Sequence, residues 1–114
     1  MHDSLSAKFA ALADPTRRAM LARLAHAELT LADLAKPMEM TVPAVAKHLA
    51  VLERAGFVVR SSPTRSVARP AKLQVAAFSE LSDWIEQCRV HWEGSFERLA
   101  EYLETPDAMG SKNV

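Results

Sequence analysis

The side chains that could carry chemistry in this 114-residue sequence are cations and hydrogen-bond donors between residues 41 and 69. Lys47, His48 and Arg65 can donate hydrogen bonds to phosphate oxygens, and a lysine can also donate to guanine. Apolar groups beside them can contact only the apolar parts of a base, such as the methyl group of thymine. These residue types predict contact with double-stranded DNA. The predicted DNA-contacting residues are Thr41, Val42, Pro43, Ala46, Lys47, His48 and Arg65.

The distribution of charge along the chain favours the same partner. Fourteen Lys and Arg residues balance fourteen Asp and Glu residues, which excludes a chain held to nucleic acid by bulk positive charge. Residues 40–74 nevertheless carry six cations against one acid, whereas residues 75–114 carry three cations against eight acids. We therefore expect the basic middle segment to form the DNA-contacting surface.

Two short helices joined by a tight link are predicted to position these residues. The first begins after Thr30, which starts a capping box, and Pro37 is predicted to mark its end. The second begins after Thr41 and ends before Gly56, because glycine suits the position just past a helix C-terminus. Such a pair is a helix-turn-helix, over about residues 30–55, whose second helix can enter the major groove.

The apolar pattern divides the second of these helices into two faces. Val45, Leu49 and Leu52 recur at helical spacing and are predicted to point into the core. The face that carries Lys47 then points outward, near the N-terminal half of the helix. His48 lies between the faces, and its ring can hydrogen-bond to a phosphate or pack beneath the segment that follows.

That following segment is predicted to be a β-hairpin that acts as a wing. Phe57–Arg60 is a short β-like run, and after a turn residues 65–69 are predicted to form the returning strand, which Pro70 ends. Arg65 lies at the predicted tip of this wing, which covers about residues 57–70. The expected fold is mainly α with a small β-hairpin, a winged helix-turn-helix.

Three further helices complete the five that the sequence predicts. Leu5, Phe9 and Leu12 form the apolar stripe of the first helix, and Asp14 with Pro15 begins the second. The fifth helix covers about residues 75–104, and its apolar side chains recur every three or four positions.

A stripe of this length needs a partner, because the short helices of one domain cannot cover all of it. We expect part of it to pack against a second copy of the chain; the alternative is that it folds back on its own domain only. The predicted dimer interface consists of Leu5, Phe9, Ile85, Cys88, Trp92, Phe96 and Leu99.

Three stretches of the sequence resemble the ArsR-type winged-helix transcriptional regulators: Ala13–Arg18, Leu31–Ala35 and Val45–Val58. Their order and spacing carry the resemblance, which covers about residues 5–104. It implies a cytoplasmic, homodimeric DNA-binding protein, commonly a repressor, whose first and last helices form the dimer interface. Many relatives have serine or threonine at the position of Ala46, which puts the preferred operator sequence in question.

Metal sensing, common in this family, is not expected here. Many relatives carry a cysteine pair in the third helix, but residues 31–34 contain no thiol or imidazole. On the last helix Cys88 and His91 have a spacing that permits shared ligation, although a cysteine on an apolar stripe is usually a small hydrophobe. We predict no metal and no cofactor, as in a metal-independent branch of the family. The sequence does not identify any small-molecule inducer.

Other classes of function are excluded or disfavoured. A single cysteine excludes an intrachain disulfide framework, and no apolar run approaches the 18 or so residues of a membrane span. No nucleophile and base have a supporting arrangement, so we expect no enzyme. We predict one domain at residues 1–104 and a flexible tail at residues 105–114. A dimer should bind an inverted-repeat operator; the alternative is a winged-helix module that binds protein and not DNA.

Overall fold

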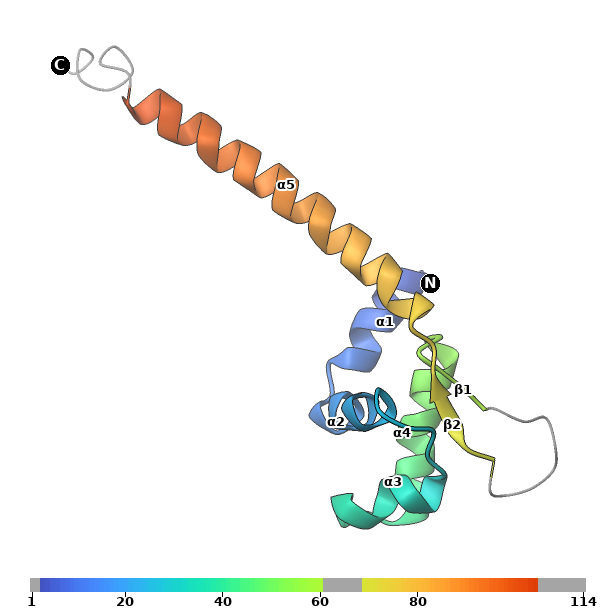
Figure 1. Cartoon of the computed structure of the whole chain (residues 1–114). Coiled ribbons are helices and arrows are strands. Elements are labelled where there is room, and N and C mark those ends of the chain that lie inside the picture. Colours follow the sequence, from blue (N-terminus) through green and yellow to red (C-terminus); the bar gives the residue numbers. More distant parts are fainter. Residues whose placement is uncertain (1–2, 61–68, 105–114) are drawn as a thin grey trace. The chain divides into compact units, whose positions relative to one another are not determined.

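The structure is a computed structural model that describes residues 3–60 and 69–104 (Figure 1). The described residues divide into two compact units, which meet between Leu81 and Ser82 in the sequence. Within these described ranges, five helices and one antiparallel pair of strands confirm the predicted fold class, mainly α with a small β-hairpin. The helices are α1 (Ser4–Leu12), α2 (Pro15–Leu24), α3 (Leu31–Met38), α4 (Val42–Arg54) and α5 (Ala76–Glu104), and the strands are β1 (Val58–Arg60) and β2 (Ala71–Leu73).

The first four helices begin where their capping residues predict. Asp3, Asp14, Thr30 and Thr41 each accept a hydrogen bond from the backbone N–H three residues later, over 2.7 to 3.3 Å. Each side chain thereby satisfies one N–H that has no partner within its helix. The Asp33 carboxylate also accepts from the Thr30 N–H, which confirms the predicted capping box.

Helix α3 continues one residue past Pro37, which was predicted to mark its end. It stops at Met38, and Glu39 follows in the left-handed conformation, with φ at 55°. Proline has no N–H to donate to the carbonyl four residues earlier, which belongs to Asp33. The Arg23 guanidinium from α2 donates to that carbonyl over 2.9 Å. The proline is therefore tolerated within the last turn of the helix.

The end of α4 is formed as predicted. Gly56 has a φ of 90° and donates its N–H to the Glu53 carbonyl, while the Phe57 N–H donates to the Leu52 carbonyl, both over 3.0 Å. These two bonds form a Schellman motif, which satisfies carbonyls that the helix leaves unpaired. The motif turns the chain directly into β1.

The hairpin differs from the prediction in its returning strand. β1 pairs with β2 so that Arg60 lies opposite Ala71, and β2 begins after Pro70. The prediction that Pro70 ends the strand is therefore wrong, and the paired part of the wing extends to Leu73. Ala71 also exchanges two backbone hydrogen bonds, of 2.7 and 3.1 Å, with Leu29. Residues 61–68, which include the predicted turn and most of the predicted strand at residues 65–69, lie outside the described residues.

The first unit is built around one apolar core. Val45, Leu49 and Leu52 are at most 1% exposed, which confirms the predicted inward face of α4. The rings of Phe57 and Phe78 pack with their centroids 4.8 Å apart and so join the start of β1 to the start of α5. The other fully buried large side chains are Met20, Leu34 and Val58.

The second unit is the part of α5 that begins at Ser82, and its apolar stripe is exposed in the single chain. Trp92 and Phe96 are 57% and 63% exposed. On another face, Arg89 forms ion pairs with Glu86 and Glu93, one turn away on either side. The predicted tail, residues 105–114, lies outside the described residues. Within the described ranges, no helix is long and apolar enough to cross a membrane.

Candidate nucleic-acid interface

The candidate interface is the face of α4 that points away from the core. Val42, Pro43 and Lys47 are exposed on it, and Ala46 is partly exposed. Helical spacing places Lys47 nearly half a turn from both Val45 and Leu49, and Pro43 about a third of a turn or more from them. Val42 lies nearer the core side by this spacing, but it is the first residue of the helix and is 43% exposed. The first half of the helix therefore presents one flexible cation beside small apolar groups.

Thr41 lies at the start of this face and is exposed. Its hydroxyl oxygen accepts the Ala44 N–H over 3.3 Å, so the side chain already holds the helix end in place. The hydroxyl proton of a capping threonine is still available to donate. Thr41 can thus cap α4 and donate to a phosphate at the same time.

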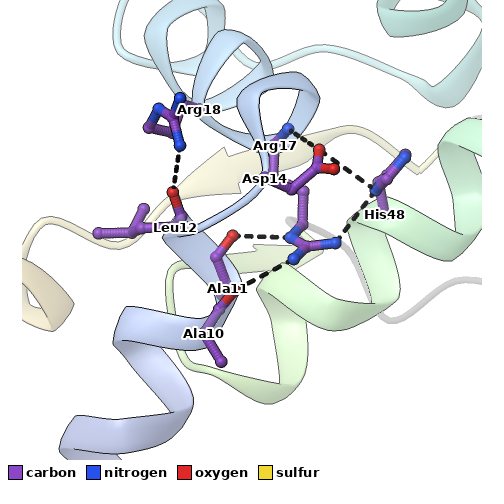
Figure 2. A network of polar contacts seen from close by, with 7 residues as sticks. All are labelled: Ala10, Ala11, Leu12, Asp14, Arg17, Arg18 and His48. Carbon is purple, nitrogen blue, oxygen red and sulfur yellow. Dashed lines mark hydrogen bonds and ion pairs between the residues drawn. The ribbon is translucent and has the colours of Figure 1, made fainter.

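His48 is placed by contacts with α2. Its Nδ1 atom lies 3.3 Å from Nη1 of Arg17 and 3.9 Å from Oδ2 of Asp14, and its side chain is 24% exposed (Figure 2). Two roles were considered from the sequence, a hydrogen bond to phosphate and packing beneath the hairpin, and the contacts that the structure gives are with the start of α2. Both roles stay predictions.

Arg17 ties three segments of the first unit together. Its Nε donates to the Ala11 carbonyl over 2.7 Å and its Nη2 to the Ala10 carbonyl over 3.1 Å, both at the end of α1 (Figure 2). The same guanidinium reaches His48 on α4. Arg18 makes a simpler contact, donating to the Leu12 carbonyl over 2.7 Å. The α1–α2 corner is therefore fixed by two neighbouring arginines, of which one also touches α4.

Asp14 completes this polar network. Its carboxylate accepts the Arg17 N–H over 3.0 Å, and this bond, helped by the positive charge of the Arg17 side chain, lowers the pKa of Asp14. The carboxylate is thus stabilised in its ionised form beside His48. The sequence identified Asp14 only as a helix cap and Arg17 only as a cation near a helix start. Their contacts with His48, which lies 34 positions after Asp14 and 31 after Arg17, have no local signal.

Near the base of the wing, Arg60 turns back onto its own hairpin. Its Nη1 donates to the Arg69 carbonyl over 3.2 Å, and its Nε lies 3.9 Å from a carboxylate oxygen of Glu53. Arg60 is therefore engaged within the first unit. Arg65, the predicted phosphate contact at the tip, lies outside the described residues.

The predicted dimer residues are found in both units. In the first, Leu5 packs partly buried against the core and Phe9 is 38% exposed. In the second, Ile85, Trp92, Phe96 and Leu99 are all more than half exposed, and Cys88 is partly buried. Within residues 3–60 and 69–104, His, Cys, Asp and Glu side chains form no cluster of three that could hold a metal ion.

Comparisons with known proteins agree on one class of protein. A family profile described as a helix-turn-helix domain matches residues 12–60. Over 58 residues the chain is 48% identical to the HTH-type transcriptional regulator Rv2034 of Mycobacterium tuberculosis, a match that covers 50% of this chain and 54% of that regulator. The match thus spans about half the length of this curated relative.

Solved structures extend the similarity to most of the chain. The structure is similar to the crystal structure of an ArsR family transcriptional regulator, with a TM-score of 0.72 and 35% identity, over 80% of this chain and 98% of that one. It is also similar to an ArsR-like transcriptional regulator from Rhodococcus sp. RHA1, with a TM-score of 0.75 and 26% identity, over 86% of this chain and 91% of that one.

Proposed function

This chain belongs to the ArsR family of winged helix-turn-helix transcriptional regulators, and from that premise we propose that it is a homodimeric repressor binding an inverted-repeat operator. The family consists of regulators and not of enzymes. The observation that carries the proposal is the division of α4, whose core face is at most 1% exposed while Lys47 stands exposed on the opposite side and Val42 is exposed at the start of the helix. We propose that the protein is cytoplasmic and that this face of α4 enters the major groove of DNA.

The residues of this face have complementary roles in the proposal. Lys47 donates to guanine O6 and N7 or to a phosphate, and Val42, Pro43 and Ala46 offer apolar contact to a thymine methyl group. Ala46 has no hydroxyl and so cannot hydrogen-bond to a base. Arg65 on the wing contacts a phosphate and positions the domain without reading sequence.

The dimer in this proposal forms through the apolar stripe of α5. Trp92 and Phe96 are exposed in the single chain, and burying large aromatic side chains against a second copy removes apolar surface from water. Two winged domains related by a twofold axis would read two half-sites, about one helical turn apart, in successive major grooves.

The DNA-binding part of the proposal is tested with single variants. Genomic fragments that crosslink to the wild-type protein would be sequenced to identify the operator, and affinities measured by fluorescence anisotropy over a salt series. We expect Lys47→Ala to weaken operator binding by about 1–3 kcal/mol and to relax the preference at one base pair per half-site. Arg65→Ala should weaken binding to all sequences similarly and reduce the salt slope by about two per dimer.

Arg98→Ala is the matched control, because it removes one exposed cation from the second unit. It should leave both the affinity and the salt slope at their wild-type values. If Lys47→Ala and Arg65→Ala also bind like the wild type throughout the salt series, the proposed surface is wrong. A protein-binding winged-helix module then becomes the better explanation.

The dimer is tested by sedimentation equilibrium. The wild-type chain should sediment with about twice its 12.5 kDa mass. Phe96→Glu should shift it to monomer, because an unpaired carboxylate in an apolar interface is strongly unfavourable. Val90→Glu introduces the same group at another exposed position of α5 outside the stripe and should leave the dimer intact. A wild-type protein that stays monomeric at micromolar concentration would contradict the proposal.

We also propose that metals do not regulate this protein, because the stretch that carries thiols in metal-sensing relatives reads Leu31-Ala32-Asp33-Leu34. Chelators should leave operator affinity unchanged, and zinc, cadmium or arsenite should not release the DNA. Stoichiometric metal in the purified protein, together with release of DNA on metal addition, would overturn this part.

A further inference from the structure

The Nδ1 atom of His48 faces one hydrogen-bond donor and one hydrogen-bond acceptor. Nη1 of Arg17 lies 3.3 Å away, and a guanidinium can only donate a hydrogen bond. Oδ2 of Asp14 lies 3.9 Å away, and a carboxylate can only accept. A neutral imidazole has one N–H, so Nδ1 can either accept from Arg17 or donate to Asp14, and not both.

Two observations indicate that Nδ1 of His48 accepts a hydrogen bond from Arg17 and does not donate one to Asp14. The 3.9 Å separation from Asp14 is beyond hydrogen-bond range, and that carboxylate oxygen already accepts the Arg17 backbone N–H over 3.0 Å. The guanidinium is itself held in place, because the Ala10 and Ala11 carbonyls accept from its other nitrogens. Nδ1 is therefore the acceptor, and the single proton of the neutral ring belongs on Nε2.

We infer that Arg17 is a positioning residue for DNA binding, which holds neutral His48 in the tautomer whose Nε2–H donates to a DNA phosphate. Figure 2 shows the second ring nitrogen of His48 pointing away from Arg17 and Asp14, and the side chain is partly exposed. The inference rests on the proposed function, since it needs DNA at the outer face of α4.

Removal of the Arg17 guanidinium reverses which tautomer of neutral His48 is preferred. The Asp14 carboxylate is then the charged group left facing Nδ1, and it favours a proton on that nitrogen. Nε2 would carry a lone pair, which cannot donate to a phosphate oxygen and is repelled by it. Arg17 therefore determines whether the outer nitrogen of His48 attracts or repels the DNA backbone.

The first test measures the tautomer directly in the free protein. Long-range ¹H–¹⁵N NMR correlations at neutral pH distinguish protonated from unprotonated ring nitrogens. In the wild type Nε2 of His48 should be protonated, and in Arg17→Met the proton should move toward Nδ1. Arg18→Met is the matched control, because Arg18 also anchors the end of α1, through the Leu12 carbonyl. It should keep the wild-type tautomer.

The second test measures operator affinity at two pH values. Arg17→Met should bind at least about a hundredfold more weakly than wild type at about pH 8, the effect of losing one hydrogen bond to a charged group in each half-site of the dimer. A protonated imidazole carries both N–H groups, so this deficit should shrink at a lower pH at which the NMR spectrum shows both ring nitrogens of His48 protonated. Asp14 and Arg17 are the charged groups that contact the ring in the described part of the chain, and the lowered pKa of Asp14 keeps it ionised at both pH values.

A merely structural effect of Arg17 would behave differently, because a misplaced helix would bind weakly at both pH values. His48→Gln provides a further check: its amide nitrogen replaces Nε2 as a donor and has no tautomers. In that background Arg17→Met should have little additional effect on affinity.

The inference is overturned if wild-type His48 carries its proton on Nδ1, or if Arg17→Met keeps the wild-type tautomer and affinity. A deficit that persists at low pH, or persists in the His48→Gln background, also overturns it. A wild-type protein that binds no DNA would instead defeat the proposed function, and this outcome is distinct because the NMR measurement is made without DNA.

Discussion

Replacing Arg23 by methionine should destabilise the helix-turn-helix, because this side chain compensates for the proline in α3. Pro37 cannot donate to the Asp33 carbonyl, and the Arg23 guanidinium donates to it over 2.9 Å and to the Leu34 carbonyl over 3.0 Å. Methionine keeps most of the apolar stem but has no donor. The variant therefore leaves the Asp33 carbonyl without a protein partner and removes the side-chain donor from the Leu34 carbonyl.

The size of the effect follows from the exposure of the two bonds. A hydrogen bond from a charged group contributes about 1.5–3 kcal/mol when its partner is shielded from water. The bond to Leu34 is partly buried, whereas water can replace the exposed bond to Asp33. We expect Arg23→Met to lower the free energy of unfolding by about 1.5–3 kcal/mol in total, most of it from the Leu34 carbonyl.

Urea unfolding followed by circular dichroism, at one fixed protein concentration, measures this change. Arg54→Met is the control, since it also removes a cation from the last turn of a helix, and its cost should be below about 0.5 kcal/mol. In a Pro37→Ala background the new N–H supplies the Asp33 carbonyl, so the cost of Arg23→Met should fall by about 0.5 kcal/mol or more. A cost no larger than that of Arg54→Met, or one unchanged by Pro37→Ala, would refute the reasoning.

Three further predictions concern the first unit. Leu49→Ala should cost about 2–5 kcal/mol of stability in urea unfolding because Leu49 is 1% exposed, whereas Lys47→Ala on the opposite face should stay within about 0.5 kcal/mol of wild type. Gly56→Ala should cost about 1–2 kcal/mol in the same assay, since a φ of 90° is strained for any residue with a Cβ atom. Asp14 has a lowered pKa in the folded state, so its charge stabilises the protein above the ordinary carboxyl pKa and this contribution is lost as the pH falls through the folded value. Asp14→Asn keeps a capping side chain without that charge, so the difference in urea midpoint between the variant and wild type should narrow below about pH 4; a constant difference would contradict this assignment.

The helices could be predicted because their signals are local. A capping side chain and the N–H that it satisfies are three residues apart, as for Thr30 and Asp33, and an apolar face repeats every three or four residues. The inward residues of α4 follow from the same periodicity. The turn into β1 is equally local, because a single glycine permits the left-handed conformation that ends α4.

The returning strand of the wing could not be placed by such signals. Pro70 can end one strand or precede another, since both positions avoid the ladder hydrogen bond that proline cannot make. The choice depends on Ala71, which pairs with Arg60 on one side and with Leu29 on the other. Leu29 is 42 positions away along the chain, and its pairing exists only once α2 and the hairpin have packed together.

The sequence by itself thus determined which residues cap the helices, which side of α4 is buried and, through the order of its motifs, the family. The tertiary structure decided where β2 begins and what surrounds His48. The physical reason is the range of the interactions: helix caps and apolar stripes are satisfied within one or two turns, whereas the Arg17 guanidinium meets the His48 ring only because α1, α2 and α4 share one core. No periodicity along the chain encodes a donor and an acceptor 31 residues apart, so packing alone gave His48 its two charged neighbours.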